Sequence, residues 1–254
     1  MVSLTPSTTE MVAAIGARDR LVGVDRYSVY PAQVKALPKV GDFVHPSFEA
    51  IVTLQPDLVI LAAVQARLTS KLQRAGIRTL TLAVHTIEDV RAGLRKVGAA
   101  LGRGDQAEAA IRKLGADMAS IHAKIAKRGG PKPRVAIIIG RQVGTLRTMV
   151  AAGPGSFMDE LIGQLGATNA LASSPVRYPK ISVEQIMRSK PDIILDAVRS
   201  NEAAAAKSDW AALNQVPAVK NGRVYPLTDQ IFMAPGPRVG QALRMLAHVL
   251  YPDL

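Results

Sequence analysis

The feature that most constrains the fold is an internal repeat, because the chain matches itself in two places. The segment EMVAAIGA at Glu10 aligns with ELIGQLGA at Glu160, and EAIVTLQPDLVIL at Glu49 aligns with EQIMRSKPDIILD at Glu184. Both members of the first pair have the pattern of an amphipathic helix that stops at glycine. Both members of the second pair have the pattern of a helix, a Pro-Asp turn and a buried strand. The repeat predicts two lobes of the same design.

The least strand-like part of the chain lies between the two copies, at residues 86–130. Thr86 and Asp89 have the spacing of a capping box, which predicts a first helix. After a glycine-rich break, Asp105 can cap a second helix that runs to about residue 128. At ~1.5 Å per residue, this second helix would be about 35 Å long, which is enough to bridge two lobes.

The order of the predicted elements indicates the fold class. Strands alternate with helices in both copies, which predicts an α/β fold with two Rossmann-like lobes, mostly parallel sheets and a long interlobe α-helix. We place an N-terminal α/β lobe at residues 1–104, the bridging helix at 105–130 and a C-terminal α/β lobe at 131–254. Such sheets bind ligands beyond the carboxyl ends of their strands, so we expect the cleft to face those ends.

Composition excludes several classes of protein. The chain has 254 residues, of which 48% are hydrophobic, and this is enough to bury a substantial core. Its apolar runs are shorter than the ~20 residues that cross a bilayer, so we expect no membrane span. Cysteine is absent, which excludes disulfides, thiolate catalysis and cysteine-ligated metals. The opening MVSLTPSTTE lacks the basic and apolar regions of a signal peptide, and we expect the native chain to begin before Met1.

The net charge is strongly positive. The formal charge of +12, from 32 Lys+Arg against 20 Asp+Glu, favours acidic partners. The charges are dispersed and only 4% of the residues are aromatic, so we expect a solvated basic surface and no binding of nucleic acid. Loop arginines would suit an anionic ligand, although surface exposure alone also explains them; they are Arg26, Arg67, Arg141 and Arg147.

The sequence carries no motif typical of an α/β enzyme. The glycine-rich segment at 153–156 lacks the lysine of a phosphate-binding loop and the spacing of a dinucleotide motif, and it predicts a turn into a helix capped by Ser156. No GxSxG nucleophile elbow is present. We therefore expect a protein that is not an enzyme, with a doubly wound α/β enzyme as the alternative of another class.

The segments VSLTPSTTE, LVGVDRYSVYP, LPKVGDFVHPSFEAIVTLQPDLVI and RYPKISVEQIMRSKPDIIL resemble the cobalamin, haem and siderophore-binding proteins of ABC importers. The resemblance covers essentially the whole chain and implies two α/β lobes joined by one long helix. Cobalamin-binding members are the most similar, because Phe43 stands where they place an aromatic ring against the corrin. Haem-binding relatives usually have a tyrosine ligand one position earlier, where this chain has Asp42.

The resemblance also implies a function. The protein would capture cobalamin or a related corrinoid in the cleft between the lobes and deliver it to the permease, with haem or a ferric siderophore as alternative cargo. The metal chelate is then a transported ligand, and no intrinsic cofactor is implied. We expect a monomer in the periplasm, or lipid-anchored outside the cytoplasmic membrane, that meets the membrane only through the permease.

Most of the ligand site follows from the same resemblance, which implies Ser7, Tyr27, Phe43, Tyr178, Asp229 and Phe232 as ligand-binding residues. We add His45, two residues beyond Phe43, and Arg141, in a loop expected to approach the cleft, as further ligand contacts. Ser7 also heads a capping-box spacing with Glu10. His45 is a candidate axial ligand of cobalt or iron, and His85 is a weaker one, although a histidine that only faces solvent is more common. Each aromatic residue taken alone could equally be packed in the core.

One glutamate in each lobe matches the residues with which family members pair to arginines of the permease. These are Glu49 and Glu184, which the internal repeat also aligns. A purely structural explanation competes with docking, because Ser47 and Ser182 are plausible N-caps. A carboxylate in the first turn of a helix is favoured by the helix dipole, by ~0.3–1 kcal/mol.

Overall fold

The computed structural model describes residues 1–254, except for the side chain of Ala66. The chain divides into two compact units. Unit 1 comprises Met1–Ala116 and Ala234–Arg238, and unit 2 comprises Asp117–Met233 and Val239–Leu254. Each unit is built on its own sheet with helices packed against it, so the predicted α/β class is confirmed.

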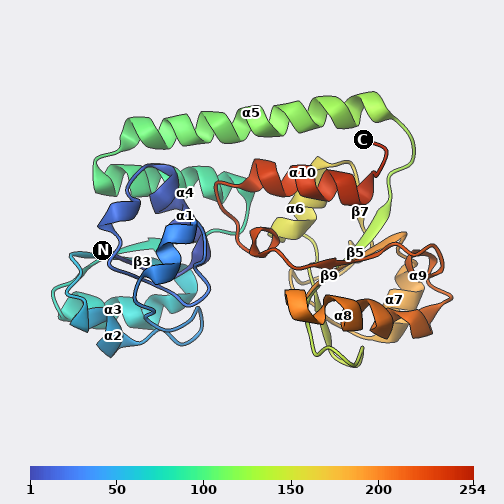
Figure 1. Ribbon diagram of the computed structural model, residues 1–254, viewed down its shortest axis with the longest axis horizontal. Coiled ribbons are helices and arrows are strands. Elements are labelled where there is room, and N and C mark those ends of the chain that lie inside the picture. Colours follow the sequence, from blue (N-terminus) through green and yellow to red (C-terminus); the bar gives the residue numbers. More distant parts are fainter. The chain divides into compact units, whose positions relative to one another are not determined.

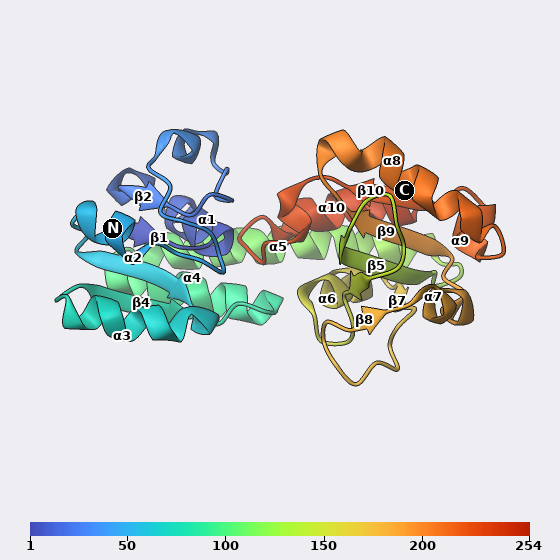
Figure 2. The same cartoon turned by 90° about the horizontal axis from the view of Figure 1, so that it is seen from below.

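Unit 1 contains a four-stranded parallel sheet in the order β2-β1-β3-β4. The strands are β1 (Val2–Ser3), β2 (Gly23–Val24), β3 (Leu58–Ala62) and β4 (Arg78–Leu82). Figure 2 shows them side by side, from β2 through β1 to β4. The first four residues of β3 are buried, as expected for a parallel strand covered on both faces.

Helices cover both faces of this sheet. They are α1 (Pro6–Ala14), α2 (Phe48–Thr53), α3 (Ala66–Arg74) and α4 (Ile87–Leu101). Figure 1 shows α1 and α4 on one face and α2 and α3 on the other. The predicted capping box is confirmed at the start of α4, where Thr86 and Asp89 each accept a backbone N–H of the other.

Helix α5 (Gly104–Arg128) has 25 residues and is the longest element of the structure. Its residues up to Ala116 belong to unit 1 and the remainder to unit 2. Buried apolar residues recur three or four positions apart along one side: Ala107, Ile111, Leu114, Met118 and Ile121. Asp105 was predicted to cap this helix, but the helix begins at Gly104 and Asp105 lies within its first turn. In the described part of the chain, no helix combines the length and the hydropathy that a bilayer crossing requires.

Unit 2 contains a six-stranded sheet in the order β10-β9-β5-β6-β8, with β7 paired to β5. The strands are β5 (Arg134–Arg141), β6 (Met149–Ala151), β7 (Thr168–Asn169), β8 (Lys180–Ile181), β9 (Ile193–Ala197) and β10 (Val224–Leu227). Strands β10, β9, β5 and β7 pair in parallel, whereas β6 is antiparallel to β5 and β8. The prediction of mostly parallel sheets is therefore confirmed.

Helices also cover both faces of the second sheet. They are α6 (Phe157–Gln164), α7 (Val183–Ser189), α8 (Ala203–Asp209), α9 (Pro217–Lys220) and α10 (Val239–Leu250). Figure 1 shows α6 and α10 on one face and α7, α8 and α9 on the other. Short 3₁₀ helices lie at η1 (Arg18–Arg20), η2 (Ala32–Ala36), η3 (Ala63–Gln65), η4 (Ser200–Glu202), η5 (Trp210–Leu213) and η6 (Gln230–Phe232).

The two copies of the longer repeat fold alike. Ser47 caps α2 and Ser182 caps α7, as predicted, because each hydroxyl accepts the backbone N–H of the residue three positions on. The residue before the following proline is Gln55 in one copy and Lys190 in the other. Both adopt a left-handed backbone, with φ of 46° and 44°. The matched strands β3 and β9 follow directly.

The shorter repeat has matching ends and different starts. Helices α1 and α6 are both followed by a left-handed glycine, Gly16 with φ of 71° and Gly166 with φ of 74°. Ser156 caps α6 as predicted. The cap of α1 is Thr5, however, and Ser7 lies within the first turn. The helix starts earlier than predicted because a proline occupies its first position, where its fixed φ suits a helix.

Candidate functional site

The loop that begins at Gly41 carries the predicted residues Phe43 and His45. One carboxylate oxygen of Asp42 accepts the backbone N–H of Val44 at 2.9 Å and that of His45 at 2.7 Å. These hydrogen bonds, first that of His45, hold the pKa of Asp42 below its ordinary value. Gly41 has φ of 103°, and a Cβ there would lie 2.4 Å from the carbonyl oxygen of His45. The loop is thus tightly folded, and it leaves Phe43 41% exposed.

Gln65 ties this loop to the carboxyl end of β3. Its side-chain NH2 donates to the carbonyl of Phe43 at 2.9 Å, and its side-chain oxygen accepts the backbone N–H of Ala62 at 3.0 Å. Gln65 is buried. Gln65 was not among the predicted site residues, although a polar residue so soon after a buried strand is a signal that the sequence offers.

A second loop lies beside the first. The backbone N–H of Arg26 donates to the carbonyl of Gly41 at 2.9 Å, and the Arg26 guanidinium lies 3.8 Å from the Asp42 carboxylate. Tyr27, which is 47% exposed, follows directly. The structure therefore brings the predicted aromatic residues Tyr27 and Phe43 onto neighbouring loops of unit 1.

A buried polar network supports the Tyr27 loop. Buried Asp25 accepts the backbone N–H of Tyr27 at 3.0 Å and the hydroxyl of Ser28. Burial raises the pKa of the Asp25 carboxyl, and the hydrogen bond from Ser28 opposes this shift only in part. Hydrogen-bonded hydroxyls continue from Ser28 through Thr9, Ser3, Thr8 and Thr5. This network joins β1, α1 and the segment after β2, and it was not predicted from the sequence.

Glu10 has a partner that the sequence did not reveal. Its carboxylate accepts two hydrogen bonds from the Arg238 guanidinium, at 2.6 and 2.9 Å. The same guanidinium lies 3.9 Å from the centre of the Tyr30 ring. Glu10 therefore holds the segment Ala234–Arg238 to unit 1, in place of the predicted capping box with Ser7.

In unit 2, the predicted residues occupy different environments. Tyr178, in the loop before β8, is 47% exposed, and the neighbouring carbonyl of Arg177 accepts the backbone N–H of Gly153 at 2.8 Å. Exposed Asp229 caps η6 by accepting the backbone N–H of Ile231 at 2.9 Å. Phe232 is only 3% exposed, unlike the other three aromatic residues predicted for the site.

Arg141, at the carboxyl end of β5, is braced from within unit 2. Its buried guanidinium donates to Asp196 at 2.8 and 2.9 Å and to Asp209 at 2.7 Å. The carbonyls of Gln142, Thr145 and Ala206 accept further hydrogen bonds. Burial would lower the pKa of Arg141, but the hydrogen bonds to the two carboxylates outweigh it and raise the pKa. The donors of this predicted ligand contact are therefore engaged within the protein.

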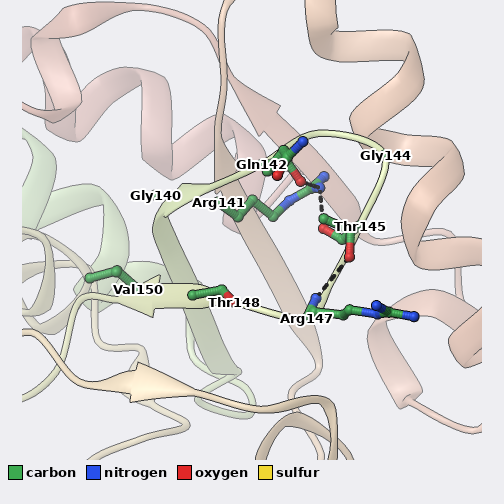
Figure 3. A pocket seen from close by; sticks show the side chains of 8 residues that line it. All are labelled: Gly140, Arg141, Gln142, Gly144, Thr145, Arg147, Thr148 and Val150. Atoms are coloured by element: carbon green, nitrogen blue, oxygen red, sulfur yellow. Dashed lines mark hydrogen bonds between the residues drawn. The ribbon is translucent and has the colours of Figure 1, made fainter.

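The hairpin between β5 and β6 surrounds a hollow of about 790 Å³. Its lining residues are Gly140, Arg141, Gln142, Gly144, Thr145, Arg147, Thr148 and Val150. Figure 3 shows the Arg141 side chain reaching toward Thr145 under the loop. The Arg147 side chain points away from the other lining side chains. Asp209 also accepts the backbone N–H of Gly144 at 2.9 Å, so the brace holds the loop at a second point.

The histidines are dispersed over the chain. His45 is exposed, and its Nδ1 lies 3.5 Å from the Asp42 carboxylate. His85 is also exposed, and only its backbone N–H bonds to Asp89. Within the described residues, no three His, Cys, Asp or Glu side chains gather as a metal site would require. Of the predicted metal ligands, His45 is the one on the same loop as Phe43.

Glu49 and Glu184 have the same local setting in their two units. Each is exposed and lies in the first turn of a helix, two residues after the capping serine. The hydroxyl of Ser47 donates to Glu49 at 3.4 Å. A hydrogen bond from Ser182 lowers the pKa of the Glu184 carboxyl. Both side chains are therefore open to solvent.

Comparison with known proteins connects this architecture to a family. A family model described as "Periplasmic binding protein" matches residues 1–231. The chain is 30% identical to an uncharacterised ABC transporter substrate-binding lipoprotein of Bacillus subtilis, covering 100% of this chain and 80% of that protein. It is 28% identical to the vitamin B12-binding protein of Salmonella typhimurium, and the match covers 98% of this chain and 89% of that protein. A periplasmic haem-binding protein from Roseiflexus in apo form superposes with a TM-score of 0.89 at 27% identity, covering 99% and 97%.

Proposed function

The chain belongs to the family of periplasmic binding proteins, and from this membership we propose that it captures a corrinoid such as cobalamin and delivers it to the permease of an ABC importer. The proposed identity of the cargo rests on the similarity, over almost the whole chain, to the vitamin B12-binding protein. The corrinoid is transported and is not a resident cofactor. We further propose that the protein has no catalytic activity.

The exposed aromatic rings support a flat macrocyclic ligand. Tyr27 and Phe43 lie on neighbouring loops of unit 1, and Tyr178 is similarly exposed in unit 2. Such rings can stack on the face of a corrin or porphyrin. Exposed Asp229 remains a proposed ligand contact. Ser7, Phe232 and Arg141 are buried, and we propose that they support the site from inside the fold.

Haem is the second candidate, and it is favoured by the similarity to the haem-binding protein from Roseiflexus. The position of the usual tyrosine ligand is occupied by Asp42, whose carboxylate is committed to the loop backbone. Metal coordination would therefore fall to His45. With Nδ1 facing Asp42, its Nε2 is the atom that would bind iron or cobalt.

A thermal-shift panel of cyanocobalamin, cobinamide, hemin and ferric siderophores tests the cargo. A ligand present at 100 times its Kd stabilises the folded protein by about 2.7 kcal/mol, which raises Tm by several degrees. We expect this shift for the corrinoids. A shift for hemin alone would favour the second candidate, and His45→Ala would then alter its absorption bands if His45 is the axial ligand. A panel without any shift would contradict the proposal.

Glu49 and Glu184 are proposed to dock on arginines of the permease. Their support is the matched setting on two equivalent helices, with both carboxylates exposed. We expect the double variant Glu49→Arg, Glu184→Arg to bind cargo as the wild type does and to lose uptake in vesicles that contain the permease. Glu88→Arg, another exposed first-turn glutamate, is the matched control. Normal uptake by the double variant would exclude docking through these residues.

Three further properties are part of the proposal. We propose a location in the periplasm or on a lipid anchor, supported by the family description and by the lipoprotein from Bacillus subtilis. We also propose a monomer, which light scattering after size exclusion would test. The proposed lobes at 1–104 and 131–254 are joined by a bridging helix at 105–130, and this is supported by a helix α5 whose residues belong to both units.

A further inference from the structure

We infer that unit 2 carries a surface for an anionic phospholipid bilayer, formed by five exposed basic residues at and before the amino ends of its parallel strands. We call this surface the basic edge, and it comprises Lys127, Lys132, Arg134, Lys190 and Lys220. The inference goes beyond the proposed function, because it concerns where the protein resides while it is not docked on the permease. It replaces the expectation that the protein meets the membrane only through the permease.

Folding brings the basic edge together from separate parts of the chain. Strands β10, β9 and β5 are parallel neighbours, and a lysine precedes each of them: Lys220, Lys190 and Lys132. The Arg134 guanidinium donates to the carbonyl of Ser189 at 3.0 Å, which joins the loops before β5 and β9. The backbone N–H of Ala218 donates to the carbonyl of Pro191 at 2.9 Å, which joins the loops before β9 and β10. Figure 1 shows the end of α5, where Lys127 lies, and helix α9 at the same end of unit 2.

The charges of the basic edge are not neutralised within the protein. Residues 118–158 include seven Lys and Arg and no Asp or Glu. The carboxylates of the neighbouring segments are already engaged. Asp192 accepts the backbone N–H of Arg134 at 2.8 Å, and Asp253 lies 3.6 Å from the Arg128 guanidinium. In the described part of the chain, none of the five basic residues has a carboxylate within ion-pairing distance.

An anionic bilayer suits the basic edge better than a nucleic acid does. The five charges lie on three loops and one helix end, so they present a broad charged face. Among the described residues, no exposed large apolar side chain belongs to these loops, so no aromatic ring is placed to stack on bases. Clustered Lys and Arg residues are attracted to anionic headgroups within a Debye length of the membrane surface, and this attraction needs no apolar insertion.

The basic edge and the proposed docking residue of unit 2 lie at opposite ends of α7. Glu184 is in the first turn of this seven-residue helix, and Lys190 follows its last residue. The proposed ligand contact Asp229 likewise follows β10, whereas Lys220 precedes that strand. A protein held to a bilayer through the basic edge therefore keeps these residues of unit 2 turned away from the lipid and able to bind cargo. Contact with lipid through the basic edge and docking through Glu184 are then alternatives on one membrane.

Co-sedimentation with vesicles at low salt tests the inference. One set of vesicles contains only phosphatidylcholine, and the other contains equal parts of phosphatidylcholine and phosphatidylglycerol. We expect the wild type to bind only the anionic vesicles and to be released when the salt concentration is raised. The triple variant Lys132→Gln, Lys190→Gln, Lys220→Gln should bind them at least about ten-fold more weakly, because three charges leave the surface.

A second triple variant separates the basic edge from the net charge of the protein. Lys71→Gln, Lys96→Gln, Lys207→Gln removes the same charge from exposed positions on α3, α4 and α8, and binding should change less than about three-fold. Equal losses in the two triple variants would trace binding to net charge and overturn the basic edge.

A wild type that does not bind anionic vesicles would also overturn the inference. If it bound soluble polyphosphate instead, the partner of the basic edge would be an anionic polymer. The vesicle assay contains neither cargo nor permease, so its result is independent of the thermal-shift panel that tests the proposed function. The two proposals can therefore fail separately.

Discussion

At the scale of single residues, Arg141 shows how burial changes a role that the sequence suggests. A loop arginine in a basic chain is expected to face solvent or an anionic ligand. In the structure its guanidinium instead joins Asp196 and Asp209, which lie 55 and 68 residues further along the chain. The single tryptophan, Trp210, completes the cluster by donating its Nε1–H to Asp196 at 2.9 Å. No local pattern could reveal partners so distant.

We predict that Arg141→Ala lowers the free energy of unfolding by about 3–5 kcal/mol, because it leaves two carboxylates without their counter-charge in a buried site. Urea titration followed by Trp210 fluorescence measures this in unit 2. Arg244→Ala is the control, since its ion pair with Asp117 is exposed and should be worth about 0–1 kcal/mol. Similar losses in both variants would contradict the role given to the brace.

A second residue-scale prediction concerns Asp25. Burial raises its pKa above the ordinary 3.8, so the folded protein holds this proton more tightly than the unfolded chain does. The stability linked to the proton is full below about pH 4 and is lost as the pH rises through the raised pKa. Relative to the wild type, Asp25→Asn should therefore gain stability as the pH rises from 4 to 7. Urea unfolding followed by circular dichroism measures the free energy of unfolding of both proteins at each pH. Exposed Asp19→Asn should follow the wild-type curve.

At the scale of elements, the sequence predicted the helices best where their signals are local. The caps at Ser47, Ser182, Ser156 and Thr86 were all identified, because a cap and its partner are three residues apart. The cap of α1 was misplaced because two hydroxyl residues compete there, and a proline decided in favour of Thr5. Helix packing, by contrast, requires residues far apart in the sequence.

Two glycines in neighbouring helices illustrate this difference. A Cβ on Gly98 in α4 would lie 2.6 Å from the Cβ of Ala107 in α5, whereas a Cβ on Gly115 in α5 would meet nothing within 4 Å. We predict that Gly98→Ala lowers the free energy of unfolding by about 1–3 kcal/mol through overpacking. Gly115→Ala should raise it by about 0.5–1 kcal/mol, since alanine favours a helix. Denaturant titration measures the free energy of unfolding of both variants. If Gly98→Ala were stabilised as Gly115→Ala is, the close packing of α4 on α5 would be refuted.

At the scale of the whole molecule, the assignment of chain segments to units departs from the order of the sequence. Ala234–Arg238 belongs to unit 1, although the segments on both sides of it belong to unit 2. The pair Glu10–Arg238 joins residues 228 positions apart and anchors this return segment. The sequence alone predicted a C-terminal lobe without interruption, because nothing near Arg238 indicates a distant carboxylate.

We predict that Glu10→Gln makes the protein more sensitive to trypsin after Arg238, by about ten-fold, because loss of the buried charge pair frees the return segment. Mass spectrometry of timed digests identifies the new cleavage. Glu88→Gln removes an exposed partner of Arg91 and should leave the rate of cleavage after Arg238 unchanged. Equal protection of Arg238 in all three proteins would show that Glu10 does not anchor the segment.

The sequence by itself determined the features that depend on neighbouring residues: the two repeated α/β copies, their capped helices, the buried strands and the matched Glu49 and Glu184. The tertiary structure alone decided which side chains are available to a ligand. It left Tyr27, Phe43 and Tyr178 exposed, buried Phe232, and engaged Arg141 while leaving Arg147 open. The physical reason is that periodicity and capping act over a few residues, whereas burial and charge pairing depend on groups that only folding brings together.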